Sequence, residues 1–172
     1  MAKKVISIIA AAVLAAVLCS CSGGGESLDL YTAAGNVMDD FGFSGGTVYS
    51  NSGEDGTEEM TDALAASYYG TGYSDHADFS SASEYYIWIN MDDPLNPMEF
   101  GVFRIPDEAA REEFMTYLEE RVERQIEEAK GYPSIDTSGL TGAVFDSSGE
   151  YIWYCAVKDS NSKIDRYFKK NL

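Results

Sequence analysis

Hydrophobic and polar residues alternate over residues 98–105, and a helical period of three and four replaces this alternation over residues 107–129. The alternation predicts a β-strand that presents one set of side chains on each face. Asp107 supplies a helix cap, and Gly131 ends the helix. The helical stripe, interrupted by two polar residues, consists of Ala110, Phe114, Tyr117, Leu118, Arg121, Val122, Gln125, Ile126 and Ala129. Because such a helix is unstable alone in water, we expect it to pack on the sheet that contains the preceding strand.

Two pairs of short apolar stretches predict two antiparallel hairpins. Residues 84–90, EYYIWIN, are rich in aromatic and β-branched side chains, and a turn rich in Asp and Pro joins them to residues 98–105. Residues 139–146 and 150–157 form the second pair, with a turn rich in Ser and Gly between them. A terminal helix over residues 160–170 follows, capped by a serine at its start.

The N-terminal half has weaker signals. Residues 27–41 predict a weak helix, and residues 42–56 predict a loop with a short extended piece at 47–50. The capping-box sequence DGTE begins a helix over residues 55–70, which a glycine ends. Residues 71–83 are polar and rich in serine, so we expect a connecting loop there.

The order of these elements predicts an α+β fold. A helix is followed by two strand-strand-helix units, and the similarity of EYYIWIN to EYIWYCAV indicates a duplicated unit, although strand composition alone also produces such similarity. We therefore expect a four-stranded antiparallel sheet with helices packed on one face.

The first 20 residues have the features of a lipoprotein signal peptide. Lys3 and Lys4 form a positive region, and residues 5–18 are an apolar run that is short for a membrane span. The sequence Leu-Cys-Ser-Cys21 resembles the lipobox of bacterial lipoproteins, which predicts Cys21 as the lipid attachment site. An ordinary secretory leader that is cut nearby and an uncleaved N-terminal anchor are the alternatives.

These features divide the chain into three parts. Residues 1–20 are the signal peptide, residues 21–56 a lipid-anchored flexible tether and weakly structured segment, and residues 57–172 an α+β domain. Removing 20 of the 172 residues leaves 152, and the loss of Lys3 and Lys4 changes the formal net charge from −17 to −19. Phosphate backbones and anionic lipid surfaces repel so acidic a chain, so we expect no nucleic-acid partner and membrane attachment through the lipid.

The three cysteines are not expected to form a disulfide. Cys19 leaves with the leader and Cys21 is modified, so Cys155 is the remaining thiol of the mature chain. Cys155 lies in the middle of a predicted strand, where we expect an inert buried thiol.

Three patterns partly match catalytic or metal sites. Residues 42–46, GFSGG, match the G-x-S-x-G nucleophile elbow but lack its strand-turn-helix context. His76, the only histidine, lies beside Asp75 and Asp78 in a serine-rich loop, which favours a solvated side chain over a metal ligand. Residues 51–62 resemble an EF-hand loop but break its pattern at the third and last positions. We therefore expect no catalytic residue, no cofactor and no metal site.

Charged residues of the strand and the long helix have structural interpretations. Arg104 stands at the end of its strand, where it either pairs with an acid of the helix or lines a pocket. We expect the helix glutamates to form a solvated face with Arg111, Arg121 and Arg124, including an i,i+4 pair between Glu120 and Arg124.

Several segments beside the lipobox form a recognisable set: Tyr68-Tyr69-Gly70, Glu99–Arg104, Tyr117–Gln125, Tyr132-Pro133 and Gly149–Tyr154. Together they resemble a family of bacterial lipoproteins, common in clostridia-like Gram-positive bacteria, that carry one shared domain of unknown function. The resemblance covers residues 57–168, about two thirds of the chain. It implies a location at the outer face of the cytoplasmic membrane, and it implies no catalytic residues.

The sequence favours a non-catalytic, lipid-anchored extracytoplasmic domain that binds a protein partner or a small ligand at the cell surface. An accessory or solute-binding subunit of a membrane system is an alternative, and so is an enzyme with a carboxylate-based site. Carboxylates that converge in a pocket would favour the enzyme, whereas a flat, exposed aromatic sheet face would favour a protein partner.

Overall fold

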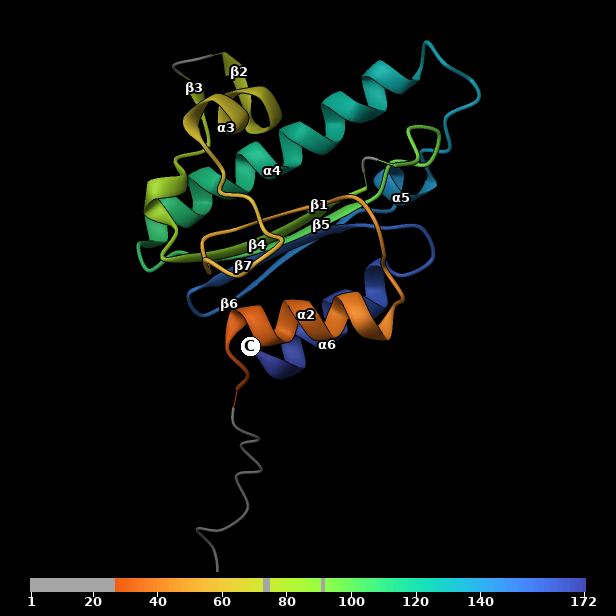
Figure 1. Ribbon diagram of the computed structural model, residues 1–172. Coiled ribbons are helices and arrows are strands. Elements are labelled where there is room, and N and C mark those ends of the chain that lie inside the picture. The colour runs from red at the N-terminus through yellow and green to blue at the C-terminus, as the bar shows by residue number, and fades with distance from the viewer. Residues whose placement is uncertain (1–26, 73–74, 91) are drawn as a thin grey trace, which may run out of the picture.

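The computed structural model describes residues 27–72, 75–90 and 92–172. Five strands form one antiparallel sheet in the order β1-β4-β5-β7-β6 (Figure 1). The strands are β1 (Thr47–Ser50), β4 (Glu84–Ile89), β5 (Glu99–Arg104), β6 (Val144–Ser148) and β7 (Tyr151–Ala156). Both predicted hairpins are therefore present and lie side by side, and β1 and β6 are the two edges of the sheet.

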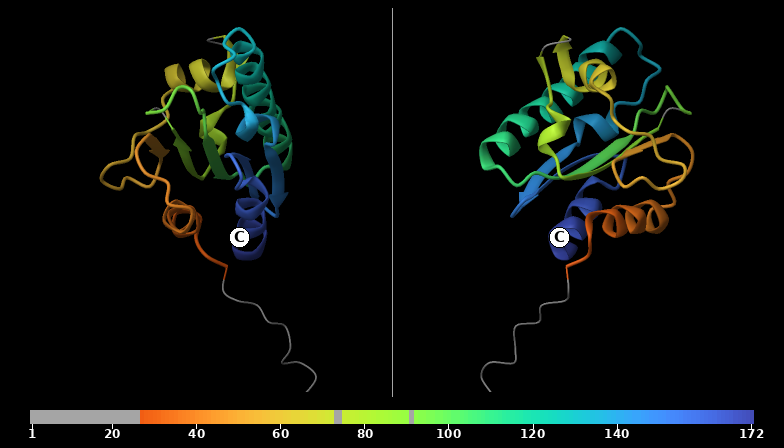
Figure 2. Two further views of the ribbon diagram at one scale, coloured as in Figure 1. Left: turned by 90° about the vertical axis from the view of Figure 1, so that its right-hand side faces the viewer. Right: turned by 60° about the vertical axis from the view of Figure 1, so that its left-hand side comes forward.

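Helices cover both faces of this sheet and give the molecule three layers (Figures 1 and 2). On one face lie α2 (Leu30–Asp40) and α6 (Asn161–Asn171), and on the other lie α3 (Asp62–Tyr69) and α4 (Glu108–Ala129). The smaller elements are β2 (Gly70–Gly72), β3 (Asp75–His76), the 3-10 helix η1 (Phe79–Ser81) and α5 (Ser138–Thr141). Strands β2 and β3 pair with each other and stand above α4.

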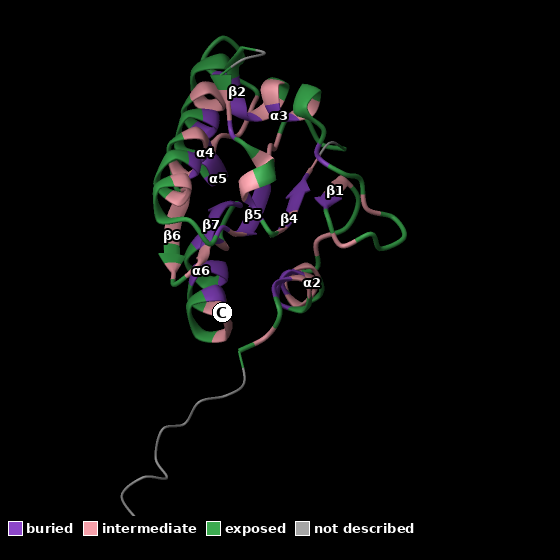
Figure 3. Ribbon diagram, turned by 90° about the vertical axis from the view of Figure 1, so that its left-hand side faces the viewer, coloured by how far each residue is buried: buried purple, intermediate pink, exposed green. Residues whose placement is uncertain are grey.

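The α+β class with an antiparallel sheet is confirmed, but the expectations of four strands and of helices on one face are wrong. The central strands are apolar on both faces. On β7, Trp153 and Cys155 pack against the α2–α6 layer, while Ile152 and Tyr154 pack against the α3–α4 layer, and all four are buried. A sheet that is apolar on both faces needs a helical layer on each. Figure 3 shows the buried strands between two layers of helices whose outer faces are exposed.

Part of residues 21–56, predicted as a tether followed by a weakly structured segment, belongs to the fold. Helix α2 begins where the side chain of Asp29 accepts a hydrogen bond from the backbone N–H of Thr32 at 2.9 Å. Its fully buried side chains are Leu30, Ala33, Ala34 and Val37. Strand β1 follows it and pairs with β4 along its whole length. A domain boundary at residue 57 is therefore too late, because the described fold already includes α2 and β1.

Helix α3 is shorter than the predicted helix over residues 55–70. Glu58 donates its backbone N–H to the carbonyl of Val48 at 2.9 Å and accepts from the N–H of Ser50 at 2.8 Å. A residue that bonds a strand through both backbone groups cannot also belong to a helix, so the helix begins later, after the cap at Thr61. The predicted end at Gly70 is confirmed.

The first strand of the second hairpin begins later than predicted. Residues 138–141, where a strand was expected to begin, form the short helix α5, and β6 starts at Val144. Asn161 explains the shift, because its side-chain amide donates to the carbonyls of Gly139 at 2.9 Å and Gly142 at 2.7 Å. These bonds fix the α5 turn against the start of α6, which no local pattern indicates.

The long helix has the predicted start. The side chain of Asp107 accepts a hydrogen bond from the N–H of Ala110 at 2.8 Å, and α4 then continues for 22 residues. It lies across the sheet as a nearly straight rod (Figure 1). Within residues 27–72, 75–90 and 92–172, the helices are too short or too polar to cross a membrane.

Candidate functional site

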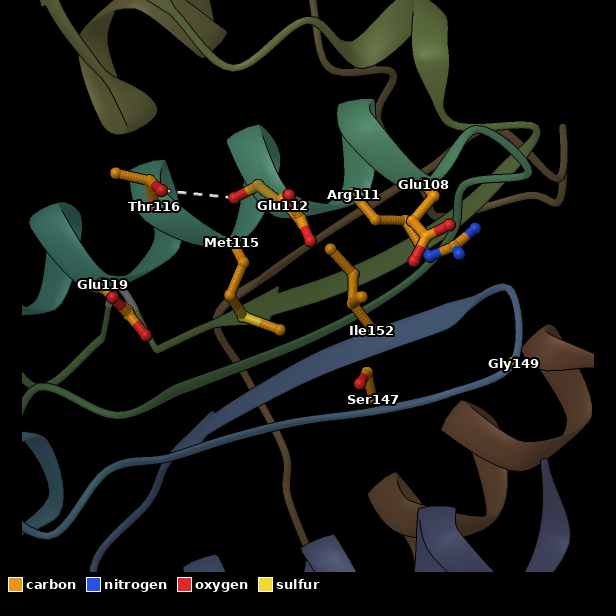
Figure 4. A pocket seen from close by; sticks show the side chains of 9 residues that line it. All are labelled: Glu108, Arg111, Glu112, Met115, Thr116, Glu119, Ser147, Gly149 and Ile152. Atoms are coloured by element: carbon orange, nitrogen blue, oxygen red, sulfur yellow. Dashed lines mark hydrogen bonds between the residues drawn. The ribbon is translucent and has the colours of Figure 1, made fainter.

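A cavity of about 500 Å³ lies between the first half of α4 and the hairpin of β6 and β7 (Figure 4). In that view Met115 points from α4 toward Ile152 on β7, and Ser147 lies on β6 below them. The residues that line this cavity are Glu108, Arg111, Glu112, Met115, Thr116, Glu119, Ser147, Gly149 and Ile152.

A second cavity, of about 250 Å³, continues the first along the same side of α4. Glu119 lines both cavities, and the second reaches α5 and the start of β6. Its lining residues are Glu119, Val122, Glu123, Ile126, Leu140, Thr141, Ala143 and Phe145. We call the two cavities together the α4–β6 groove.

The groove is open because β6 is an edge strand that extends beyond the cover of α4. Phe145 pairs in register with Tyr154, and Ser147 pairs with Ile152, so each pair shares one face of the sheet. On β7 the members of these pairs are buried, whereas on β6 Phe145 is half-buried and Ser147 is exposed. One step across the sheet, from β7 to β6, therefore leads from the core to an open surface that carries Phe145 and Ser147.

The α4 wall of the groove is acidic. Glu108, Glu112, Glu119 and Glu123 are exposed along it. The one cationic side chain of the lining, Arg111, donates to the carbonyls of the strand end that precedes α4, at 2.7 and 2.9 Å. Because four glutamates stand against this single arginine, the wall presents mainly carboxylates to a ligand.

A third cavity, of about 300 Å³, lies beside the second half of α4, between the end of α3 and the loop that joins β4 to β5. Its lining residues are Ser67, Tyr68, Ile89, Asn90, Pro97, Met98, Glu99, Arg121, Arg124, Gln125 and Glu128. We call it the polar pocket.

A buried ion pair forms the base of the polar pocket. Arg121 donates from Nε to Oε1 of Glu99 at 2.7 Å and from Nη2 to Oε2, in the two-point geometry typical of arginine and carboxylate. The two residues are only 5% and 1% exposed. Burial lowers the pKa of Arg121, but the Glu99 carboxylate together with the Tyr69 and Tyr154 side chains holds that pKa above its ordinary value. The guanidinium of Arg121 is therefore charged inside the core.

Aromatic rings and carbonyls surround the rest of this arginine. The guanidinium carbon of Arg121 lies 4.8 Å from the ring centre of Tyr68 and 4.9 Å from that of Tyr69. Its Nη1 donates to the carbonyl of Tyr68 at 3.1 Å, and Arg124 donates to the same carbonyl at 2.7 Å and to that of Gly70 at 2.5 Å. The two arginines thus satisfy carbonyls that the end of α3 leaves without helical partners.

These contacts correct the expectation that Arg121 and Arg124 stand on a solvated face. Arg121 is buried, and Arg124 bonds α3 carbonyls in place of the expected pair with Glu120. Gln125, the other polar residue of the helical stripe, donates from Nε2 to Glu99 at 3.4 Å. Its Oε1 is buried and has no hydrogen-bond partner among the residues that the structure describes. The pocket therefore contains an orphaned acceptor.

The structure shows where most predicted candidates lie. Cys21, the predicted lipid attachment site, and the predicted signal peptide lie outside the described residues. Residues 42–46 join helix α2 to strand β1, the reverse of the order that a nucleophile elbow needs. The ring Nδ1 of His76 lies 2.9 Å from the carbonyl of Ala77. Among residues 27–72, 75–90 and 92–172, no three metal-binding side chains gather at one point.

The EF-hand-like segment has a structural use. Oδ1 of Asn51 accepts hydrogen bonds from the Tyr31 hydroxyl and the Tyr85 N–H, both at 2.9 Å, and Nδ2 donates to the carbonyl of Ser83 at 3.1 Å. This amide ties the loop after β1 to α2 and β4, so it is not placed as a calcium ligand.

Two further predictions have clear outcomes. Arg104 forms ion pairs, which was one of its two predicted roles. Its partners are Glu150 at 2.9 Å and Glu84 at 3.5 Å, beside it in the sheet. The prediction of a partner from the long helix is therefore wrong. Cys155 is fully buried and free, as expected, and burial raises the pKa of its thiol.

Sequence reasoning missed the polar pocket, although a signal for it exists. The two polar interruptions of the α4 stripe, Arg121 and Gln125, are one helical turn apart and face the sheet with the apolar residues around them. Glu99 alternates with apolar residues of β5 in the same way. A buried charge in each of two facing elements indicates an ion pair, but only the tertiary structure shows the cavity beside it.

Comparison of the chain with protein-family models, with curated proteins and with solved structures finds no match.

Proposed function

We propose that this chain is a lipid-anchored, extracytoplasmic domain without catalytic activity that binds a protein partner at the cell surface. The α4–β6 groove takes an extended, basic segment of that partner. The observation that carries the proposal is an open groove of mixed polar and apolar lining between the edge strand β6 and an acidic helix.

The groove has the length of a short peptide. It runs beside α4 from Glu108 to Ile126, a span of 18 residues, which is about 27 Å at 1.5 Å for each helical residue. An extended chain rises about 3.3 Å for each residue, so about eight residues of a partner fill it.

The groove surfaces define the chemistry of that segment. An extended chain points alternate side chains in opposite directions. One set would rest on the floor formed by Met115, Phe145 and Ile152, and the other would reach the carboxylates of Glu112 and Glu119. A segment in which apolar and basic residues alternate satisfies both surfaces, and charge complementarity also increases the rate of association.

Side chains dominate this recognition because a backbone N–H group of β6 is already hydrogen-bonded and is not free to pair with a partner strand. The N–H of Ser147 donates to the carboxylate of the preceding Asp146 at 2.8 Å. Such local bonds protect an edge strand from adding another strand along its full length. The partner is therefore held mainly by its alternating side chains.

The position of the anchor supports the same assignment. The described chain begins at Ser27 beside α2, on the face of the sheet opposite α4 (Figures 1 and 2). With a lipid on Cys21, a connection of six residues reaches at most about 20 Å. The α2–α6 layer would then lie nearest the membrane, and α4 would face away from it.

The test uses a fluorescent octapeptide of alternating lysine and valine, titrated against the purified full chain in detergent micelles. We expect saturable binding, read as fluorescence anisotropy. The double variant Glu112→Gln with Glu119→Gln should weaken it by about three- to tenfold, because each exposed charge pair contributes up to about 1 kcal/mol.

The matched control is Glu113→Gln with Glu120→Gln, which removes the same charge from exposed sites of α4 that do not line the groove. Equal weakening by both double variants would mean that the peptide responds only to net charge, and the groove assignment would fail. Absence of saturable binding by the unaltered chain would also overturn it.

A further inference from the structure

Two opposite charges stand unpaired at the polar pocket. Arg124 and Glu128 lie one helical turn apart on α4 and both line the cavity, yet neither forms an ion pair with any residue that the structure describes. Arg124 uses two of its five N–H donors on the carbonyls of α3. The pocket thus offers a separate cationic group and a separate anionic group.

Gln125 lies between them in the sequence and supplies the orphaned acceptor. Its Oε1 is buried and unpartnered among the described residues, which is costly unless a donor reaches it. The bond that holds its amide, from Nε2 to Glu99, is 3.4 Å long, beyond the usual range of such bonds. A small rotation of the amide therefore presents Oε1 to the cavity at little cost.

The remaining lining sets the size and polarity of a ligand. Glu99 and Arg121 neutralise each other at the base, so the four charged side chains of the lining have no net charge. Ile89, Pro97 and Met98 add an apolar wall. A volume of about 300 Å³ stands at the lower end of pockets that hold small molecules.

We propose that the polar pocket binds a free amino acid as its zwitterion. The α-ammonium group donates to Oε1 of Gln125 and pairs with Glu128, and the α-carboxylate accepts from the unused N–H donors of Arg124. An aliphatic side chain rests against Ile89 and Met98. The site is separate from the α4–β6 groove and does not depend on the function proposed for it.

The test measures equilibrium dialysis of radiolabelled L-leucine against the purified full chain in detergent micelles. We expect saturable binding at one site for each chain. Two competitors test the contacts to each end of the ligand separately. Leucinamide lacks the carboxylate, and 4-methylpentanoate lacks the ammonium group. Each should compete at least about tenfold more weakly than unlabelled L-leucine, because each loses a charge-assisted contact.

Variants locate the site. Glu128→Gln changes an exposed side chain, so the fold should persist, and it should weaken leucine binding by about tenfold or more. Gln125→Met, which removes the acceptor at similar size, should weaken it similarly. The exposed change Glu120→Gln, elsewhere on α4, should leave it unaltered, as should Glu112→Gln with Glu119→Gln in the groove.

Three results would overturn the proposal. Absence of saturable leucine binding at any soluble concentration would mean that water alone fills the pocket. Equal competition by all three compounds would exclude recognition of a zwitterion. Unchanged binding by folded Glu128→Gln would place the ligand elsewhere. Because leucine binding and peptide binding are measured in separate assays with separate variants, failure of this site is distinguishable from failure of the peptide site.

Discussion

Replacing Glu99 by Gln removes one charge from the ion pair that holds α4 on the sheet. The side chains of Arg121 and Glu99 are only 6% and 2% exposed, so the remaining guanidinium is largely shielded from water. Breaking one partner of a buried pair costs about 3–5 kcal/mol. We therefore expect Glu99→Gln to lower the free energy of unfolding by about that amount, a large part of the stability of a typical domain.

The double variant Glu99→Leu with Arg121→Met tests whether the charge itself is responsible. Replacing a buried pair by apolar side chains of similar size is often nearly neutral. Here the change also removes the bond from Arg121 to the Tyr68 carbonyl and the contacts with the Tyr68 and Tyr69 rings. We expect a loss of about 1–2 kcal/mol, smaller than that of Glu99→Gln alone.

Urea unfolding followed by tryptophan fluorescence measures these differences, provided that the slope with urea is the same for each variant. The thermal midpoint should fall by about 2–4 °C for each kcal/mol in a chain of this size. Glu127→Gln is the control, since it breaks the Glu127–Lys130 pair whose side chains are 67% and 64% exposed, and it should change stability by less than about 1 kcal/mol. If Glu99→Gln costs no more than this control, or if the double variant is less stable than the single one, the reasoning is wrong.

The capping of α2 and two glycines give further predictions. The Thr32 hydroxyl and backbone N–H hold the pKa of Asp29 below its ordinary value. Asp29→Ala should therefore lower the free energy of unfolding by about 1 kcal/mol at pH 7. Urea midpoints should show this difference shrinking as the pH falls from about 4 through the folded-state pKa of Asp29. Asp29→Asn, which keeps the cap, should cost less. Gly101→Ala should lose about 1–3 kcal/mol, because its Cβ would lie 2.6 Å from the Tyr154 ring. In the same thermal scans Gly35→Ala, which meets nothing within 4 Å in the middle of α2, should gain about 0.5–1 kcal/mol.

The elements with strong local periodicity were predictable. Helix α4, with its cap at Asp107, follows from side chains that recur at threes and fours, and β4, β5 and β7 follow from aromatic and β-branched runs. The predictions were wrong where a distant group overrides a local pattern. Glu58 bonds to β1, so the capping-box sequence does not start a helix there. The side chain of Asn161 bonds to Gly139 and Gly142, so the predicted strand does not start there.

Neither the α4–β6 groove nor the polar pocket could have been derived from the sequence. The groove exists because β6 occupies an edge, and strand order depends on which hairpin edges meet, which no short segment specifies. The polar pocket needs Glu99 from β5, Arg121 and Gln125 from α4 and Tyr68 from α3 at one point. The order of residues indicates only that some polar side chains interrupt the apolar faces of α4 and β5.

The sequence by itself determined the strongly periodic elements, the acidic charge and the expectation of a lipid on Cys21, because these depend on the order of residues along the chain. The tertiary structure decided that helices cover both faces, that β1 completes the sheet and that Arg121 is buried with Glu99. The physical reason is that burial depends on the partner of each face. An apolar face or a charged side chain has the same local pattern whether it meets solvent or another element, and only packing distinguishes the two.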